Sequence, residues 1–230
     1  MTWLEPIKQL DTAIFLWLNS LHSSWWDTAM MLFTRKESWL LLYLLLIYVI
    51  AQNYGRQAVV IIGVLVLGVA LSDQLSGLLK MLTQRPRPGH EPTLEGMVHI
   101  VLRKGGLYGF VSSHAANVFF VWAFTKRLFR NRATSAGLLF WAILVSYTRI
   151  YNGNHYPLDI LFGALLGVLL ALLLFWLTKR YAPRYVKSCR RGCGNKPLTN
   201  ELATLLTVGL IVIFSTLLIA VELLHKYNYL

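Results

Sequence analysis

Three separated clusters of polar residues hold the side chains that could do chemistry in this otherwise apolar chain. They read KMLTQRPRP over residues 80–88, VSSH over residues 111–114 and TRIYNGNHYPLD over residues 148–159. Lysine and arginine bind phosphate oxygens, and arginine does so with two parallel N–H groups. A histidine beside a carboxylate can act as a nucleophile, and a second histidine can act as a proton donor. Together the clusters predict a site for phosphoryl chemistry.

The anion-binding part of this site combines three cations with the start of a helix. Lys80, Arg87 and Arg149 supply the positive charge, and their guanidinium and ammonium groups suit phosphate oxygens. Ser112 stands where the N-cap of an apolar helix is expected. The first free amides of that helix would therefore point at the bound anion.

The reacting part of the site contains two histidines and one carboxylate. Pro157 suits the first turn of a helix, which puts His155 just before that helix and Asp159 four residues further on. Asp159 would then keep one ring nitrogen of His155 protonated and leave the other free as a nucleophile. His114, in the second cluster, remains as the proton donor to the leaving group.

Long apolar segments must position these clusters. Of the 230 residues, 56% are hydrophobic and 14% are charged, whereas about a quarter are charged in a soluble domain. A bilayer core requires roughly 20 apolar residues per helix. The sequence therefore predicts an all-α, polytopic membrane helix bundle with about six spans. They are Ser38–Gln52, Gln57–Leu82, Ser112–Phe129, Ala133–Tyr151, Pro157–Tyr181 and Ala203–Leu224.

The segment 1–37 differs from these spans because polar residues interrupt it and tryptophans are frequent in it. Tryptophan is enriched at the membrane–water interface. We therefore expect an N-terminal interfacial helix before a transmembrane bundle over 38–224, in a single domain 1–230. Glu5 and Pro6 near the start argue against a cleavable signal peptide.

The distribution of basic residues predicts the orientation in the membrane. The loops after the first, third and fifth spans carry twelve of the 22 Lys and Arg residues and one acid, Glu201. Basic loops face the cytoplasm. An even number of crossings separates the three polar clusters, so all three would share the opposite face, the periplasmic side of a bacterial inner membrane. The net charge of +12 then indicates anionic lipid as a partner, and nucleic acid is not expected.

Small residues recur every four positions on two of the spans. Gly68, Ser72 and Ser76 lie on the second span, and Gly163 and Gly167 lie on the fifth. This spacing lets helix backbones approach closely in lipid, so we expect helix contacts along both stripes.

The three clusters resemble the signature of the type 2 phosphatidic acid phosphatase superfamily, K-x6-R-P, P-S-G-H and S-R-x5-H-x3-D. The resemblance extends from Lys80 to Asp159 in the same order. It implies a membrane phosphatase that needs no metal or other cofactor and works through a phosphohistidine. It also implies that His155 is the nucleophile, Asp159 its orienting base and His114 the general acid. Phosphate binding would then fall to Lys80, Arg87, Ser112 and Arg149, with the backbone amide of Ser113.

Three positions depart from that signature. Val111 replaces proline, Ser113 replaces glycine and Thr148 replaces serine. Thr148 keeps the hydroxyl group, and Ser113 can still donate its backbone N–H in an ordinary conformation. We therefore expect an active enzyme.

A phosphate site at the outer membrane face favours a lipid phosphate or diphosphate as substrate. The expected substrates are lipid A and undecaprenyl diphosphate, because Arg103 and Lys104 in the 83–111 loop could bind a further anionic headgroup. Phosphatidylglycerol phosphate is an alternative. Transfer of the phosphoryl group to a lipid or sugar acceptor, and non-catalytic lipid binding or transport, are two other functions. A haloperoxidase, which uses this type of site, ranks last.

The remaining polar residues receive simpler interpretations. Asp73 lies well inside the second span, where a carboxylate is costly, so we expect it to pack against polar groups or support Lys80 indirectly. Arg85 resembles an ordinary anchor at a span end. Ordinary interfacial roles are expected for His22, His90, His99 and His225, and reduced loop thiols for Cys189 and Cys193.

Overall fold

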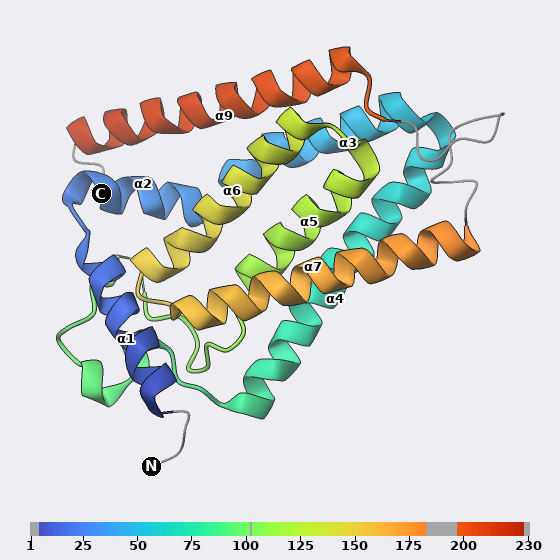
Figure 1. Ribbon diagram of the computed structural model, residues 1–230. Coiled ribbons are helices and arrows are strands. Elements are labelled where there is room, and N and C mark those ends of the chain that lie inside the picture. Colours follow the sequence, from blue (N-terminus) through green and yellow to red (C-terminus); the bar gives the residue numbers. More distant parts are fainter. Residues whose placement is uncertain (1–4, 102, 183–196, 228–230) are drawn as a thin grey trace.

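Apolar runs of the sequence form helices in the computed structural model, which describes residues 5–101, 103–182 and 197–227 (Figure 1). The long helices are α1 (Glu5–Ser20), α2 (Ser24–Thr34), α3 (Leu40–Tyr54), α4 (Ala58–Thr83), α5 (Ser113–Phe129), α6 (Arg132–Tyr151), α7 (Pro157–Tyr181) and α9 (Asn200–Lys226). Short 3-10 turns cover Glu37–Trp39, Gly55–Gln57, Pro88–His90 and Pro92–Leu94. The prediction of an all-α membrane bundle is confirmed. Cys189 and Cys193 lie outside the described residues.

The six predicted spans correspond to α3, α4, α5, α6, α7 and α9, with ends that differ by three residues at most. By length and composition, four described segments could cross a membrane: Glu37–Thr83, Arg132–Tyr151, Pro157–Tyr181 and Asn200–Lys226. The first of these contains both α3 and α4, which pack against each other. Gly55 has a φ of 56° between them, a conformation that favours glycine. The 17 residues of α5 form a shorter helix surrounded by other helices.

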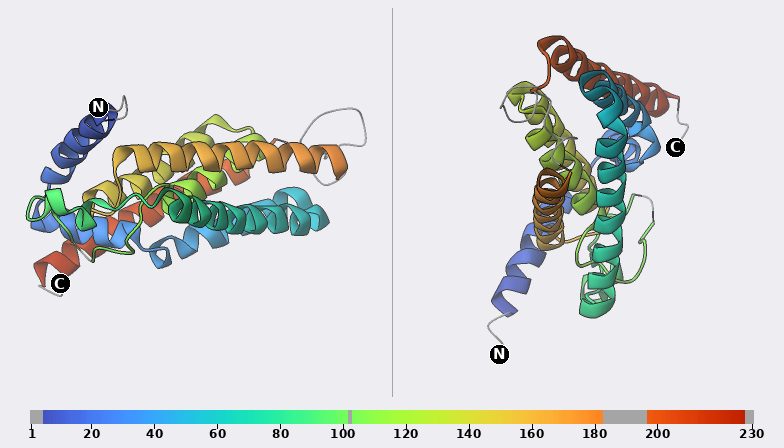
Figure 2. Two further views of the ribbon diagram at one scale, coloured as in Figure 1. Left: turned by 90° about the horizontal axis from the view of Figure 1, so that it is seen from below. Right: turned by 90° about the vertical axis from the view of Figure 1, so that its right-hand side faces the viewer.

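The described residues of the segment 1–37 form two long helices where the sequence predicted one. Ser23 accepts a hydrogen bond from the Trp26 amide and caps α2. Helix α2 packs against α6 and α9, and most of it is buried, so it belongs to the bundle. Helix α1 lies at one end of the bundle (Figure 2) and contacts α6 and α7.

Polar residues that interrupt the apolar pattern of 1–37 make specific contacts. The buried Asn19 side chain donates to the Tyr151 carbonyl (2.7 Å) and accepts from the His99 amide (2.8 Å). His99 Nε2 lies 2.8 Å from Asp27 Oδ1, which also accepts from the Tyr151 hydroxyl (2.7 Å). His99 therefore ties the 84–112 loop to α2 and α6. The simple interfacial role predicted for His99 is wrong.

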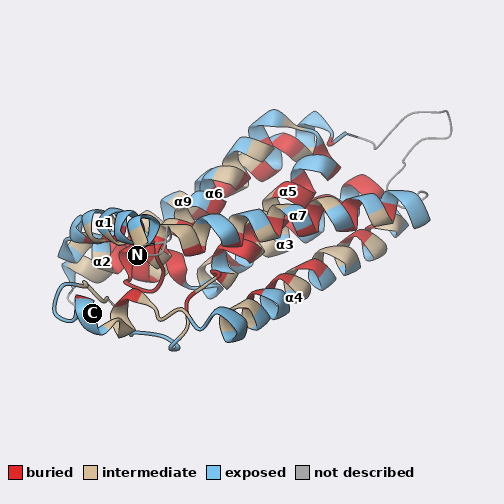
Figure 3. Ribbon diagram, turned by 60° about the horizontal axis from the view of Figure 1, so that its bottom comes forward, coloured by how far each residue is buried: buried red, intermediate tan, exposed pale blue. Residues whose placement is uncertain are grey.

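Helix α5 lies at the centre of the bundle and contacts α4, α6 and α7, whose buried faces turn inward (Figure 3). A Cβ atom at Gly167 of α7 would lie 2.1 Å from the Ala116 carbonyl oxygen of α5, and one at Gly163 would lie 2.5 Å from the Ser112 oxygen. A Cβ at Gly68 of α4 would lie within the Phe120 ring. The predicted helix contacts along both small-residue stripes are confirmed.

The ends of the helices that carry the three polar clusters meet at one end of the bundle. The end of α4, the start of α5, the end of α6 and the start of α7 lie together there, beside α1 (Figure 1). The convergence expected from the parity of the crossings is therefore present. The converging helix ends enclose a cavity.

Candidate active site

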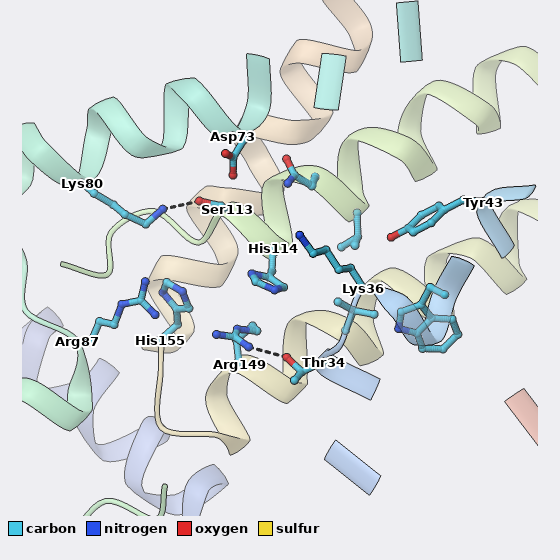
Figure 4. A pocket seen from close by; sticks show the side chains of 14 residues that line it. Thr34, Lys36, Tyr43, Asp73, Lys80, Arg87, Ser113, His114, Arg149 and His155 are labelled. Carbon is cyan, nitrogen blue, oxygen red and sulfur yellow. Dashed lines mark hydrogen bonds between the residues drawn. The ribbon is translucent and has the colours of Figure 1, made fainter. Parts of the chain in front are cut away.

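A polar cavity of about 350 Å³ opens among α4, α5, α6 and the segment that joins α2 to α3 (Figure 4). Six of the eight predicted site residues line it: Lys80, Arg87, Ser113, His114, Arg149 and His155. Thr34, Lys36, Trp39, Tyr43, Asp73, Asn117, Val118 and Val145 complete the lining. The remaining two predicted residues, Ser112 and Asp159, are fully buried behind it.

Lys80 and Arg87 approach the cavity from the end of α4 and the loop that follows it. The Lys80 ammonium donates to the Ser113 hydroxyl, which also contacts the Ser76 hydroxyl at 2.7 Å. Arg87 Nε donates to the Tyr108 carbonyl (3.1 Å), and its Nη1 donates to Asn154 Oδ1 (3.3 Å). Each cation is thus held in place by neutral oxygens, so its charge remains available to an anion.

Arg149 enters from the last turn of α6. Its Nη1 donates to the hydroxyl of Thr34, at the end of α2, and its buried Nε has no hydrogen-bond partner. An unpaired buried guanidinium N–H is costly unless a ligand accepts from it. This donor therefore favours an acceptor such as a phosphoryl oxygen in the cavity.

His155 lies in the loop just before α7 and is 2% exposed. Its Nδ1 is 3.4 Å from Asp159 Oδ2, a close approach but not a hydrogen bond. Burial, followed by the charges of Arg87, Arg149 and Lys80, holds the pKa of His155 well below its usual value of 6.5. The imidazole is therefore neutral at pH 7, with a free lone pair for attack.

Asp159 accepts hydrogen bonds at both carboxylate oxygens. Its Oδ2 accepts from the Tyr156 amide at 3.0 Å and closes the first turn of α7, as an acid at this position of a helix can. Its Oδ1 accepts from Arg85 Nη1 at 2.9 Å. The interpretation of Arg85 as a simple anchor is wrong. Its position two residues before Arg87, in the same cluster, was the available signal.

The two serines of the VSSH cluster occupy different environments. Ser112 is the N-cap of α5, as predicted: its hydroxyl accepts from the Ala115 amide at 3.4 Å. Its own amide donates to the Asp159 carbonyl at 2.9 Å and joins α5 to α7. The Ser113 side chain, which has no counterpart in the family pattern, lines the cavity and binds Lys80.

His114 points into the cavity from the first turn of α5 and lies between Ser113 and Arg149 in Figure 4. It is solvent-exposed there, opposite the buried His155. The two imidazoles thus differ in their exposure to solvent.

Two charged residues of the lining extend the predicted set. Asp73 lines the same cavity as Lys80 and, as the sequence suggested, forms no ion pair with it. Lys36 was not predicted from the sequence because this residue lies in the segment 1–37, which was expected to form an interfacial helix away from the site. Arg103 and Lys104 do not line this cavity; Lys104 borders a separate hollow beside Pro88–Gly96.

An apolar groove of about 420 Å³ continues from the polar cavity. The two share Lys36, Tyr43, Asn117 and Val118. Leucine, isoleucine and valine side chains of α3 and α4, with Val121 and Trp141, line the rest of the groove. A polar phosphate pocket that opens into an apolar groove matches a ligand with a phosphate head and hydrocarbon chains.

Comparison with protein families identifies the class of protein that this fold and site define. The model of the PAP2 superfamily matches residues 61–183, which include most of α4, all of α5 to α7 and all three polar clusters. The chain belongs to the PAP2 superfamily, and it is a membrane lipid phosphatase.

Individual relatives support this assignment. The lipid A 4'-phosphatase of Bacteroides thetaiotaomicron is 34% identical over 92% of this chain and 98% of its own length. The lipid A 4'-phosphatase of Porphyromonas gingivalis is 32% identical over 72% of each chain. The crystal structure of Aquifex aeolicus LpxE shares the fold, with a TM-score of 0.59 and 24% identity over 73% of this chain and 95% of that one.

Proposed function

We propose that this protein hydrolyses a phosphate of lipid A at the periplasmic face of a bacterial inner membrane, through a phosphohistidine at His155. The observation that carries the proposal is the buried His155 beside Asp159, at a cavity lined by the four cations Lys36, Lys80, Arg87 and Arg149. Metal independence, the outward face and the roles of individual residues are parts of this proposal.

The first half of the reaction transfers the phosphoryl group to the enzyme. The free nitrogen of His155 attacks phosphorus, the bond from phosphorus to the lipid oxygen breaks, and His114 gives that oxygen a proton. Lys80, Arg87 and Arg149, with the start of α5 at Ser112 and Ser113, offset the charge that develops on the phosphoryl oxygens. Asp159 stabilises the positive charge that the imidazole acquires.

The second half releases inorganic phosphate. His114, now neutral, takes a proton from water, and the resulting oxygen nucleophile attacks phosphorus. The phosphorus–nitrogen bond breaks and His155 returns to its neutral form. One water molecule is consumed, and one lipid alcohol and one phosphate are produced.

The apolar groove supports a lipid substrate. Because the groove meets the phosphate cavity at Lys36 and Tyr43, acyl chains can lie between α3 and α4 while the phosphate reaches His155. The lipid A 4'-phosphatase relatives favour lipid A among possible lipids. Undecaprenyl diphosphate and phosphatidylglycerol phosphate are the alternatives.

A substrate panel tests the proposal directly. Purified protein in detergent with EDTA is given lipid A, undecaprenyl diphosphate and phosphatidylglycerol phosphate, and released phosphate is measured. Lipid A should give the highest kcat/KM, and phosphate should appear without a lipid or sugar acceptor. Phosphate release from none of the three would overturn the proposed activity.

Variants test the nucleophile in the same assay. His155→Ala should abolish phosphate release and the acid-labile label left by a radioactive phosphate donor. His225→Ala, on α9 and outside the cavity, is the matched control and should retain both. A label that persists in His155→Ala would exclude the proposed intermediate.

A further inference from the structure

Three charged side chains that do not line the cavity form a row that begins beside His155: Asp159, Arg85 and Asp11. Arg85 Nη1 binds Asp159 Oδ1 at 2.9 Å, and Arg85 Nη2 binds Asp11 Oδ2 at 2.7 Å. The Asp11 and Asp159 side chains are 1% and 0% exposed. Arg85 is therefore shared between the carboxylate beside His155 and a second buried carboxylate from α1.

Asp11 also holds the start of α7. Its Oδ1 accepts from the Leu158 amide at 2.9 Å, one residue before Asp159. The Arg85 guanidinium lies over the Tyr156 ring at 4.2 Å, and Phe15 of α1 packs edge-on against the same ring. These contacts dock α1 onto the turn that carries both His155 and Asp159.

The charges in this row have a consequence for His155. A guanidinium paired with Asp159 alone would neutralise that carboxylate and weaken its attraction for a positive imidazole. Asp11 adds a second negative charge, so the row keeps one net negative charge beside the nucleophile. Burial raises the pKa of Asp11, and the hydrogen bonds from Arg85 and Leu158 oppose that rise and favour its carboxylate form.

We propose that Asp11 and Arg85 are positioning residues that set the charge and orientation of Asp159, and that α1 is therefore part of the active site. Helix α1 lies outside residues 61–183, the part that matches the family model. The inference rests on the proposed function, since it assumes that His155 becomes positively charged during the reaction.

The test is a cycle of variants that change charge with little change of shape. Asp11→Asn retains an acceptor for Leu158 and removes one negative charge. Arg85→Gln removes the positive charge, and the double variant restores the net charge of the row. Arg85→Lys keeps the charge, but a lysine has one nitrogen in place of the two guanidinium nitrogens that bind Asp11 and Asp159. Glu5→Gln, on the exposed face of α1, is the matched control.

We expect each single variant at Asp11 or Arg85 to lose about 10- to 100-fold in kcat/KM, the range found when supporting groups of a reactive site are removed. The double variant should be more active than Asp11→Asn. The acidic limb of the pH profile should move to lower pH in Asp11→Asn and to higher pH in Arg85→Gln. In both cases the sign follows from the effect of the lost charge on a positive imidazole.

Three results would overturn this inference while wild-type turnover and labelling stay normal. The first is wild-type activity in a folded Asp11→Asn variant. The second is a double variant whose loss of kcat/KM is the product of the two single losses. The third is an acidic limb of the pH profile that does not move in either single variant. If thermal unfolding shows that Asp11→Asn does not fold, Arg85→Lys decides: wild-type kcat/KM and pH profile in that variant exclude the proposal. Loss of wild-type turnover itself would instead contradict the proposed function.

Discussion

Gly167 offers the most direct test of how helix packing sets the active-site geometry. A Cβ atom there would lie 2.1 Å from the Ala116 carbonyl oxygen and 2.8 Å from the Phe120 amide nitrogen, both backbone atoms of α5. Ordinary contact begins near 3.4 Å, so α5 and α7 would have to separate by about 1 Å. Helix α5 carries His114 and α7 carries Asp159, so this separation alters the distance between these two side chains.

The expected cost of Gly167→Ala follows from that displacement. Overpacking costs about 1–3 kcal/mol of folding stability, and a misplacement of about 1 Å can reduce the rate by about 100-fold. Turnover of the lipid substrate and thermal unfolding in detergent measure the two effects. Because the binding cations Lys80 and Arg87 come from α4 and its loop, we expect kcat to fall more than KM rises.

Gly63→Ala on α4 is the matched control, because a Cβ at Gly63 has no atom within 4 Å. Alanine is favoured over glycine in a helix interior by about 1 kcal/mol, so this variant should be at least as stable as wild type. Wild-type kcat and unfolding temperature in Gly167→Ala would refute the claim that backbone contact between α5 and α7 sets the site.

Three further predictions concern the nucleophile, the phosphate site and the groove. In the proposed mechanism the neutral form of His155 attacks phosphorus, and its pKa is held well below 6.5. The value of kcat/KM should therefore persist as pH falls through 6.5, and a decline centred at that value would contradict the assignment. Thr34→Val removes the acceptor of Arg149 and should raise KM about tenfold, the effect of about 1.4 kcal/mol, whereas Thr28→Val in the same helix should not. Val66→Trp fills the apolar groove and should raise KM for a long-chain lipid phosphate but not for a short-chain phosphate, with the exposed Val59→Trp as control.

The sequence predicts the bundle well because its signals are local. Apolar runs of the required length define the helices, and Ser112 caps α5 because a serine side chain can accept from the amide three residues ahead. The convergence of the three clusters follows from the number of crossings alone. Each of these inferences needs only neighbouring residues or a count of spans.

The contacts that the sequence could not predict join residues far apart in the chain. Arg85 binds Asp11 across 74 positions, and Arg149 binds Thr34 across 115 positions. Both depend on how α1 and α2 dock against the bundle. A polar residue in an apolar segment looks the same in sequence whether it faces lipid headgroups or a buried partner. Only the tertiary structure separates the two cases.

The active site therefore combines two parts of different origin. Helices α4 to α7 and the loops that join them supply every residue that the family pattern names, and close backbone contacts hold α5 against α7. The N-terminal segment supplies Asp11 at Arg85, Thr34 at Arg149 and Lys36 at the junction of cavity and groove. Helices outside the matched region can vary without loss of the reacting groups. We therefore expect differences in lipid preference among relatives to follow residues of α2, α3 and the segment between them, and exchange of this segment between two relatives, with Asp11 left in place, should transfer substrate preference while kcat for the preferred lipid is retained.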